Sequence, residues 1–192
     1  IYIDLKDEQK KLYAAELEKV KEEMDKIMKE EGINKARFLI LQLLTKLRQI
    51  CIDPSIVYEN YTNGSNKIEQ LTALVKEYTE NEHKVLIFSS FKTALNIVKK
   101  TLEKEKIGVY MIDGSVKAKK RVEMVDAFNN KEEVKVFLIM LKSGGTGLNL
   151  TSADVVIHLD LWWNPQAENQ ATDRAHRIGQ KNTVEVIHLI SK

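Results

Sequence analysis

The sequence has little that would place the protein outside the cell or in a membrane. It contains one cysteine, Cys51, so it cannot form an internal disulfide, and this fits a reducing compartment. No secretory signal opens it, and no apolar run approaches the roughly 18 residues that a membrane-spanning helix requires. We therefore expect an intracellular protein with no membrane partner, in the cytoplasm or nucleoid of a prokaryote or in the nucleus of a eukaryote.

The sequence also lacks a strong charge of one sign. Its 30 Lys and Arg residues nearly balance 28 Asp and Glu residues, which leaves a net charge of +2. A site for a polyanion must therefore come from a local cluster and not from the charge of the whole chain. With 43% hydrophobic and 30% charged residues in 192 positions, the composition predicts one good core, or one domain with an appendage.

Two nucleotide-binding motifs are missing as well. The sequence has no Walker A motif, the glycine-rich loop that ends in Gly-Lys-Ser or Gly-Lys-Thr. It has no full apolar strand followed by an acidic magnesium-binding motif either. Asp7-Glu8 is acidic, but these residues suit the first turn of a helix, where negative charge is favoured by the helix dipole. The chain therefore carries no complete site for a nucleoside triphosphate of its own.

Residues 1–64 read as helical. A stripe of apolar residues at steps of three and four runs from Tyr13 to Ile27, and a second apolar helix follows over about 35–51. The face predicted for that second helix consists of Ile40, Leu44 and Leu47. The loop-like composition of 60–66 marks a boundary. We expect a helical extension over 1–64 and a second domain over 65–192.

In the second domain, short apolar strands alternate with amphipathic helices. The predicted strands are 85–88, 109–112, 134–140, 155–159 and 184–190, and the predicted helices are 68–78, 91–102, 122–128 and 165–178. This alternation predicts an α/β fold, an open parallel sheet with helices on both faces. Ligands of such sheets gather at the carboxyl ends of the strands, so the loops that follow the strands are the candidate site.

The loop over 142–149 is the richest in glycine. Glycines let backbone N–H groups approach an anion, and the hydroxyls of Ser143 and Thr146 add donors. The loop matches neither the Walker A pattern nor the dinucleotide-binding pattern. On local grounds a tight structural turn explains it equally well, and that alternative stays open.

The predicted helix over 165–178 carries two arginines on one face. Gln170, Arg174 and Arg177 lie at steps of four and three, while small alanines on the adjoining face allow close packing on a sheet. Two guanidinium groups held together suit a phosphate chain, because each presents a planar fork to phosphate oxygens. The alternative is a solvated helix in which Asp173 pairs with Arg177.

Several stretches together resemble the Swi/Snf family of DNA-translocating ATPases, a branch of the superfamily-two helicases. Residues 170–180 (Gln-Ala-Thr-Asp-Arg-Ala-His-Arg-Ile-Gly-Gln) are similar to motif VI of that family, and 141–151 are similar to motif V. Residues 84–91, 112–115 and 162–165 are similar to further family blocks, with Ser90 where glutamine is frequent and Met111 where arginine is common. The resemblance covers essentially the whole chain and implies a RecA-like lobe.

The resemblance also implies roles for individual residues. Arg174 and Arg177 correspond to the arginine fingers of the family. The residues that it places near the nucleotide are Gly147, Asn149 and Gln170. The residues that it places on DNA are Ser89, Ser90, Gly114, Ser115, Lys142, Ser143, Gly144, Thr146 and Trp163. For Trp163, packing under its loop is the alternative.

The same resemblance implies a motor of two lobes, of which this chain is the second, preceded by inter-lobe helices. ATP is the expected ligand, with Mg²⁺ held mainly by the first lobe, and the expected partners are double-stranded DNA and that lobe. A protein bound to the DNA is a further candidate partner. We expect the chain alone to be inactive. The alternatives are a non-catalytic nucleic-acid-binding module of RecA-like shape and the lobe of a strand-separating helicase.

Overall fold

The computed structural model describes residues 1–30, 33–131, 133–141, 148–162, 166, 173 and 183–192. The chain divides into two compact units. One unit comprises Ile1–Tyr2 and Gln70–Ile190, and the other comprises Ile3–Glu69 and Ser191–Lys192. The division between Glu69 and Gln70 lies close to the boundary that loop composition predicts at residues 64 and 65.

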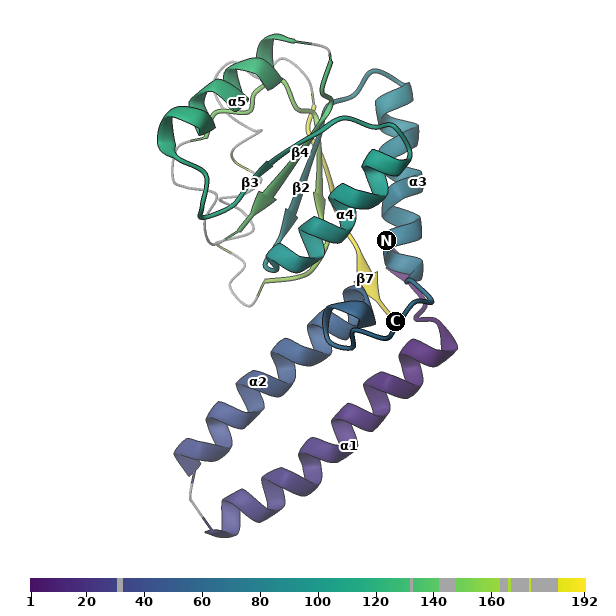
Figure 1. Ribbon diagram of the computed structural model, residues 1–192, viewed down its shortest axis with the longest axis vertical. Helices are drawn as coiled ribbons and strands as arrows, with labels where there is room; N and C mark the ends of the chain where they lie inside the picture. Colours follow the sequence, from purple (N-terminus) through teal and green to yellow (C-terminus); the bar gives the residue numbers. More distant parts are fainter. Residues whose placement is uncertain (31–32, 132, 142–147, 163–165, 167–172, 174–182) are drawn as a thin grey trace. The chain divides into compact units, whose positions relative to one another are not determined.

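The larger unit is built on a parallel sheet, of which Figure 1 labels β2, β3 and β4. The sheet has five strands in the order β3-β4-β2-β5-β6. The strands are β2 (Val85–Ser89), β3 (Val109–Ile112), β4 (Val136–Met140), β5 (Val155–His158) and β6 (Glu185–His188). Strand β2 lies at the centre, where Val85 is level with Val136 of β4 and Val155 of β5. The α/β fold with a parallel sheet that the sequence predicts is confirmed.

Helices connect the strands and cover both faces of the sheet. The helices are α3 (Asn66–Glu80), α4 (Lys92–Lys104) and α5 (Ala118–Asn130). All five residues of β2 are buried, as a strand covered on both faces requires. On one face Phe88 packs with Phe128 of α5 and Phe137 of β4. Because successive side chains of a strand alternate between faces, the buried Ile87 points to the other face, where α4 buries its apolar side.

Lys84, just before β2, is a buried cation that helps to hold α5. Its ammonium group donates hydrogen bonds to the carbonyl oxygens of Phe128 (2.7 Å) and Lys131 (3.0 Å) and lies 5.5 Å from the centre of the Phe128 ring. Carbonyl groups at the end of a helix lack partners within the helix and carry its negative dipole end. Lys84 therefore donates hydrogen bonds from the start of β2 to carbonyl groups at the end of α5 that have no partner within the helix.

The smaller unit contains a pair of long helices, α1 (Asp7–Glu30) and α2 (Ile33–Ile52). Their shared core contains Val20 of α1 with Leu43 and Leu47 of α2, and the partly buried residues packed against it are Tyr13, Leu17, Met24 and Leu39. The stripe predicted on α1 is confirmed over Tyr13 to Met24. The face predicted on α2 is partly wrong, because Leu39 and Leu43, and not Ile40 and Leu44, accompany Leu47 against α1.

Two polar caps fix the chain after α2. Asp53 accepts the Ser55 N–H (2.8 Å) at the start of a short 3-10 helix, η1 (Pro54–Ile56). The Ser65 hydroxyl accepts the N–H of Ile68 (3.2 Å) and donates to the carbonyl oxygen of Ile52 (2.5 Å). A serine in this position caps the first turn of a helix, so Ser65 begins α3 and anchors it to the end of α2.

The strand predicted over 184–190 is two strands. It ends as β6 at His188, and β7 (Ile190–Ser191) pairs instead with β1 (Tyr2–Ile3). The backbone hydrogen bonds from Ile190 to Ile1 and from Lys192 to Ile3 are both 2.9 Å long and keep one offset, which is the pattern of a parallel pair. In the part of the chain that the structure describes, no helix is both long and apolar enough to cross a membrane.

Candidate functional site at the carboxyl edge of the sheet

The strands of a parallel sheet end at one edge, and here that edge carries the polar loops. Strand β2 runs into Ser90, β3 into Asp113 and Gly114, and β5 into Asp160. Strand β4 ends at Met140, and the Leu141 N–H still donates to the Ser89 carbonyl (2.9 Å). The residues that follow β2 and β5 are adjacent, as the sequence pattern predicts, because Asp160 contacts Ser89 and Ser90.

Asp160 organises the loop between β2 and α4. Its Oδ1 accepts the hydroxyl of Ser89 at 2.6 Å and the backbone N–H of Ser90 at 3.0 Å. The Ser89 hydroxyl in turn accepts the N–H of Phe91 (3.1 Å). Ser89, Ser90 and Asp160 are all buried. Charge-assisted hydrogen bonds of this kind are strong when they are shielded from water, so Asp160 fixes the backbone course of this loop.

Asp113 has the same role in the loop after β3. Its Oδ1 accepts the Ser115 N–H (2.8 Å) and the Ser115 hydroxyl (2.5 Å), and its Oδ2 lies 2.6 Å from the ammonium group of Lys92. Asp113 is buried, whereas Gly114 and Ser115 are exposed. The turn thus presents its small residues outward while its carboxylate is held inside.

The ion pair between Lys92 and Asp113 joins two loops that are not neighbours in the sheet. Lys92 is the first residue of α4 and follows β2, whereas Asp113 follows β3, and β4 lies between these strands. The pair therefore spans the end of β4, where the chain leaves the sheet toward residue 142. The loops after β2 and β3 are held as one arrangement.

These contacts set the charge of Asp113. Its hydrogen-bonded ion pair with Lys92, followed by the two donors of Ser115, holds the pKa of the carboxyl far below its usual range. A carboxylate with a lowered folded-state pKa stabilises the protein above its unfolded-state pKa of about 3.9, and this contribution is lost as the pH falls through the folded-state pKa.

Asp113→Asn should lower the free energy of unfolding at pH 7 by about 1–3 kcal/mol, because Lys92 and Ser115 lose an ionised acceptor. Below about pH 4 the variant should lose less further stability than the wild type, since it lacks the carboxylate that becomes protonated there. Denaturant unfolding between pH 7 and pH 2 measures both effects. Asp126→Asn, which alters an exposed aspartate of α5, is the matched control. Parallel pH profiles for Asp113→Asn and the wild type would contradict the assignment.

Asn129, near the end of α5, holds the segment that follows the glycine-rich loop. Its side-chain nitrogen donates to the carbonyl oxygen of Asn149 (2.8 Å), and its side-chain oxygen accepts the N–H of Ser152 (3.3 Å). Asn149 itself is exposed. The predicted nucleotide-binding residue Asn149 thus has a fixed backbone and an exposed position, but it lies beside the end of α5, near the amino ends of the strands, and not at the carboxyl edge.

Most of the predicted site residues lie outside the described residues. These are Lys142, Ser143, Gly144, Thr146, Gly147, Trp163, Gln170, Arg174 and Arg177. Of the predicted helix over 165–178 the structure describes only Gln166 and Asp173, and Arg177, the proposed partner of Asp173 in the alternative, lies outside the described residues. The described site residues are Ser89, Ser90, Gly114, Ser115 and Asn149, and the first four come from the two loops that Asp160 and Asp113 hold.

Two residues that the structure shows at this edge have no role in the sequence-based prediction: Lys92 and Asp160. Asn129, which the sequence also leaves without a role, lies at the other end of α5, near the amino ends of the strands. Asp160 offers the clearest signal in retrospect, since it is a single carboxylate between Leu159 and Leu161 at the end of a buried strand. An acidic side chain in such a position needs a donor. The sequence does not say which donor, because Ser89 is 71 residues away.

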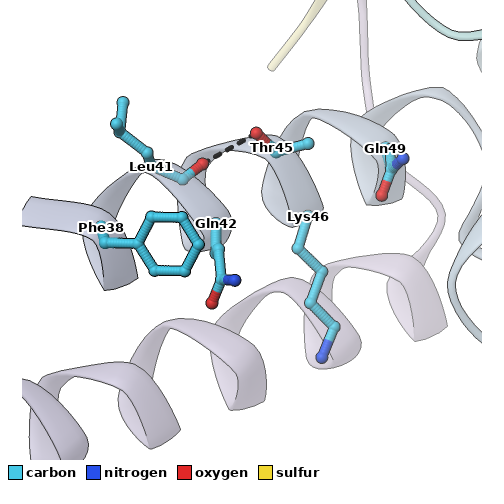
Figure 2. Close-up of a pocket in the computed structure, with 6 residues that line it drawn as sticks. All are labelled: Phe38, Leu41, Gln42, Thr45, Lys46 and Gln49. Carbon is cyan, nitrogen blue, oxygen red and sulfur yellow. Dashed lines mark hydrogen bonds between the residues drawn. The ribbon is translucent and has the colours of Figure 1, made fainter. Parts of the chain in front are cut away.

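A shallow hollow on α2 is a poor candidate for chemistry. Figure 2 shows its lining, which comes from α2 alone: Phe38, Leu41, Gln42, Thr45, Lys46 and Gln49. The ammonium group of Lys46 already forms an ion pair with the carboxylate of Glu16, at 2.5 Å. Within the described residues, no group of three or more His, Cys, Asp or Glu side chains could hold a metal ion. The strand-end loops remain the candidate site.

The comparisons with known proteins agree with this fold. Residues 66–179 match the family model of the helicase conserved C-terminal domain. An uncharacterised ATP-dependent helicase of Mycoplasma pneumoniae is 40% identical over 192 residues, and an ATPase of an ISWI chromatin-remodelling complex of Saccharomyces cerevisiae is 34% identical over 203 residues. Both alignments cover 100% of this chain but only 18% of either relative.

A solved structure extends the likeness to three dimensions. The SWI2/SNF2 ATPase core of Sulfolobus solfataricus, in complex with double-stranded DNA, matches with a TM-score of 0.85 and 35% identity over 100% of this chain and 40% of that one. The matched part includes the helices before the sheet as well as the sheet itself. The chain belongs to the helicase conserved C-terminal domain family, in its SWI2/SNF2 branch.

Proposed function

We propose that the chain is the second ATPase lobe of a motor that moves along double-stranded DNA, supplying arginine fingers to ATP held by a first lobe. The observation that carries the proposal is the arrangement at the carboxyl edge of the sheet. There the loops after β2 and β3 are fixed by Asp160 and Asp113 and joined through Lys92. A rigid set of short polar loops suits a repeating backbone better than one base sequence.

The two loops have different parts in this proposal. Gly114 and Ser115 are exposed, and their small size would let a DNA phosphate approach the backbone closely. The hydroxyl and the N–H of Ser115 both donate to Asp113, so a phosphate contact from that hydroxyl would require it to leave Asp113. Ser89 is buried and its hydroxyl is already used by Asp160 and Phe91, so a direct phosphate contact would require it to leave Asp160. Ser90 follows it in the same fixed loop. The further DNA contacts that we propose are Lys142, Ser143, Gly144, Thr146 and Trp163.

The nucleotide would be held from both lobes. Gly147, Asn149 and Gln170 are the proposed contacts from this chain, and Arg174 and Arg177 are the proposed fingers that face the phosphates. Guanidinium groups stabilise the charge that develops on a transferring phosphoryl group. Mg²⁺ would be bound mainly by the first lobe. Support comes from family membership.

The isolated chain should bind duplex DNA weakly and without sequence preference. Because only a few phosphates are contacted, the logarithm of affinity should fall with the logarithm of salt at a shallow slope, about 0.9 per phosphate contacted. Titration of labelled duplexes of different sequence at several salt concentrations measures this. A strong sequence preference, or affinity independent of salt, would count against the proposed DNA contacts.

Two other functions are possible for a domain of this fold, and experiments distinguish them from the proposed motor. A non-catalytic module of the same fold would bind nucleic acid, but it would need neither arginine finger for its function. A strand-separating helicase would release one strand of a duplex during ATP turnover, which a displacement assay with the two-lobe protein detects. A motor of this kind would work inside the cell, and a DNA-bound protein is the object it would displace or reposition.

A further inference from the structure

The start of α5 carries a dense cluster of positive charge. Four of the five residues over 117–121 are basic, in a chain whose net charge is only +2. Lys117, Lys119 and Lys120, which we call the lysine strip, are exposed. The fourth, Arg121, turns back toward the sheet. In a chain whose total charge is nearly balanced, a local cluster of positive charge of this kind can attract a polyanion.

The fold does not account for the lysine strip. Lys117 is the residue before the first turn of α5, Lys119 and Lys120 lie in that turn, and the turn contains no acidic residue. Positive side chains are unfavourable at the amino end of a helix, because the helix dipole is positive there. The lysines therefore cost α5 some stability and contribute nothing to its packing.

The described residues offer little to neutralise the strip. Lys120 lies 3.4 Å from Glu123, but the two side chains are 67% and 52% exposed, so water and salt screen the pair. Within the described part of the chain, neither Lys117 nor Lys119 has a carboxylate at ion-pair distance. The strip therefore remains electropositive in the folded protein.

Arg121 fixes the lysine strip beside the turn after β3. Its Nε donates to the carbonyl oxygen of Val116 (2.7 Å) and its guanidinium also donates to the carbonyl oxygen of Asp113 (3.2 Å). The Arg121 N–H donates to the Lys117 carbonyl (3.0 Å), as a helix requires. These bonds clamp the exposed Gly114 and Ser115 against the first turn of α5, so turn and strip form one rigid surface.

We propose that the lysine strip is a second phosphate-binding segment, which continues the DNA contact of the Gly114–Ser115 turn along the sugar-phosphate backbone. The inference rests on the proposed function, since it takes this edge of the sheet as the DNA-facing side. Lysine ammonium groups on flexible stems suit this task, because they follow a row of phosphates without reading bases. The strip supplies the long-range electrostatic part of binding, while the small, exposed residues of the turn let the DNA strand approach closely.

The test compares two triple variants of the 192-residue chain. Lys117→Gln, Lys119→Gln and Lys120→Gln together remove the strip. Lys99→Gln, Lys100→Gln and Lys104→Gln remove the same charge from the other end of α4, which lies toward the amino edge of the sheet. Fluorescence anisotropy of a labelled 20-base-pair duplex, measured from low to physiological salt, gives affinity and salt slope for each protein.

In the strip variant, the slope of log affinity against log salt should be smaller by about 2 to 3, because each phosphate neutralised contributes about 0.9 to the slope. Its affinity for the duplex at 0.1 M salt should be at least about tenfold lower. The control variant should bind like the wild type. The melting temperature of the strip variant should stay the same or rise, since the helix dipole no longer opposes the lysines. A structural role would lower it instead.

Three results would overturn the inference. If the strip variant binds duplex with the wild-type slope, the strip does not contact phosphates, while the proposed function stands. If the strip variant keeps DNA binding but loses binding to labelled polyglutamate, the strip serves an acidic protein segment. If the wild-type chain shows no salt-dependent binding of duplex at all, both the strip and the DNA-facing edge of the proposed function are wrong.

Discussion

Replacing Arg174 or Arg177 by alanine, in this chain joined to a first lobe, should lower DNA-stimulated ATP hydrolysis about a thousandfold or more, the scale on which arginine fingers act. Nucleotide affinity should change little, because the first lobe supplies most contacts to bound ATP. DNA binding without nucleotide should also stay close to wild type, since the proposed DNA contacts come from other loops. Measuring kcat beside nucleotide Kd in each variant checks the three expectations together.

Two controls sharpen the test. Lysine in place of either arginine should rescue poorly, because a point charge cannot reproduce the planar fork that meets two phosphate oxygens. Arg37→Ala removes an exposed arginine from α2, in the other unit, and should leave kcat unchanged. If both finger variants keep a kcat near wild type, the two arginines belong to an ordinary solvated helix in which Asp173 and Arg177 pair, and the finger assignment is wrong.

The chain alone should hydrolyse no ATP above background, and mixing or fusing it with its first lobe should restore turnover that duplex DNA raises further. The expectation rests on the sequence, which contains no Walker A motif, and on the described residues, among which no cluster of metal-ligating side chains occurs. In the function proposed above, Mg²⁺ and the β- and γ-phosphates are bound mainly by the first lobe.

The measurement is phosphate release by the chain, by the first lobe and by both together, with and without duplex. A first lobe whose Walker A lysine is replaced should restore nothing when mixed with this chain, which separates reconstitution from contaminating ATPase. DNA-stimulated hydrolysis by the purified chain on its own would show that the half-site interpretation is incorrect.

The elements that sequence predicts well here are those whose pattern is unambiguous. A run of four apolar residues over 85–88 predicts the central strand, found at Val85–Ser89. The stripe from Tyr13 predicts α1 and its buried face. In both, local periodicity and tertiary packing favour the same answer, so no long-range information is needed.

The errors arise where the sequence allows two answers. On α2, consecutive apolar residues over 38–41 leave several faces plausible, and packing against α1 selects Leu39 and Leu43. The segment after β6 continues as a strand, but its partner changes to β1, at the opposite end of the sequence. A pattern of residues indicates that a segment forms a strand, but it does not identify the strand with which that segment pairs.

For the candidate site too, the sequence predicts one part and not another. Its location at the carboxyl edge follows from the alternation of strands and helices. The contacts that shape it do not, because Ser89 with Asp160, and Lys92 with Asp113, are distant in sequence and each residue is polar for reasons that several environments would explain. Family resemblance carries the assignments of the arginine fingers and of the glycine-rich loop, and these stay predictions for the experiments above.

The order of the strands also determines how the chain can fold during synthesis. Strand β2 lies at the centre of the sheet, yet its neighbours β4 and β5 begin at Val136 and Val155. At roughly 5–20 residues per second, a ribosome needs several seconds after β2 to supply its first neighbour. During that interval Val85, Leu86, Ile87 and Phe88 present two unpaired edges and two apolar faces, the features that favour aggregation. We therefore expect a nascent chain of this protein to be most prone to aggregation at β2 until β4 has emerged.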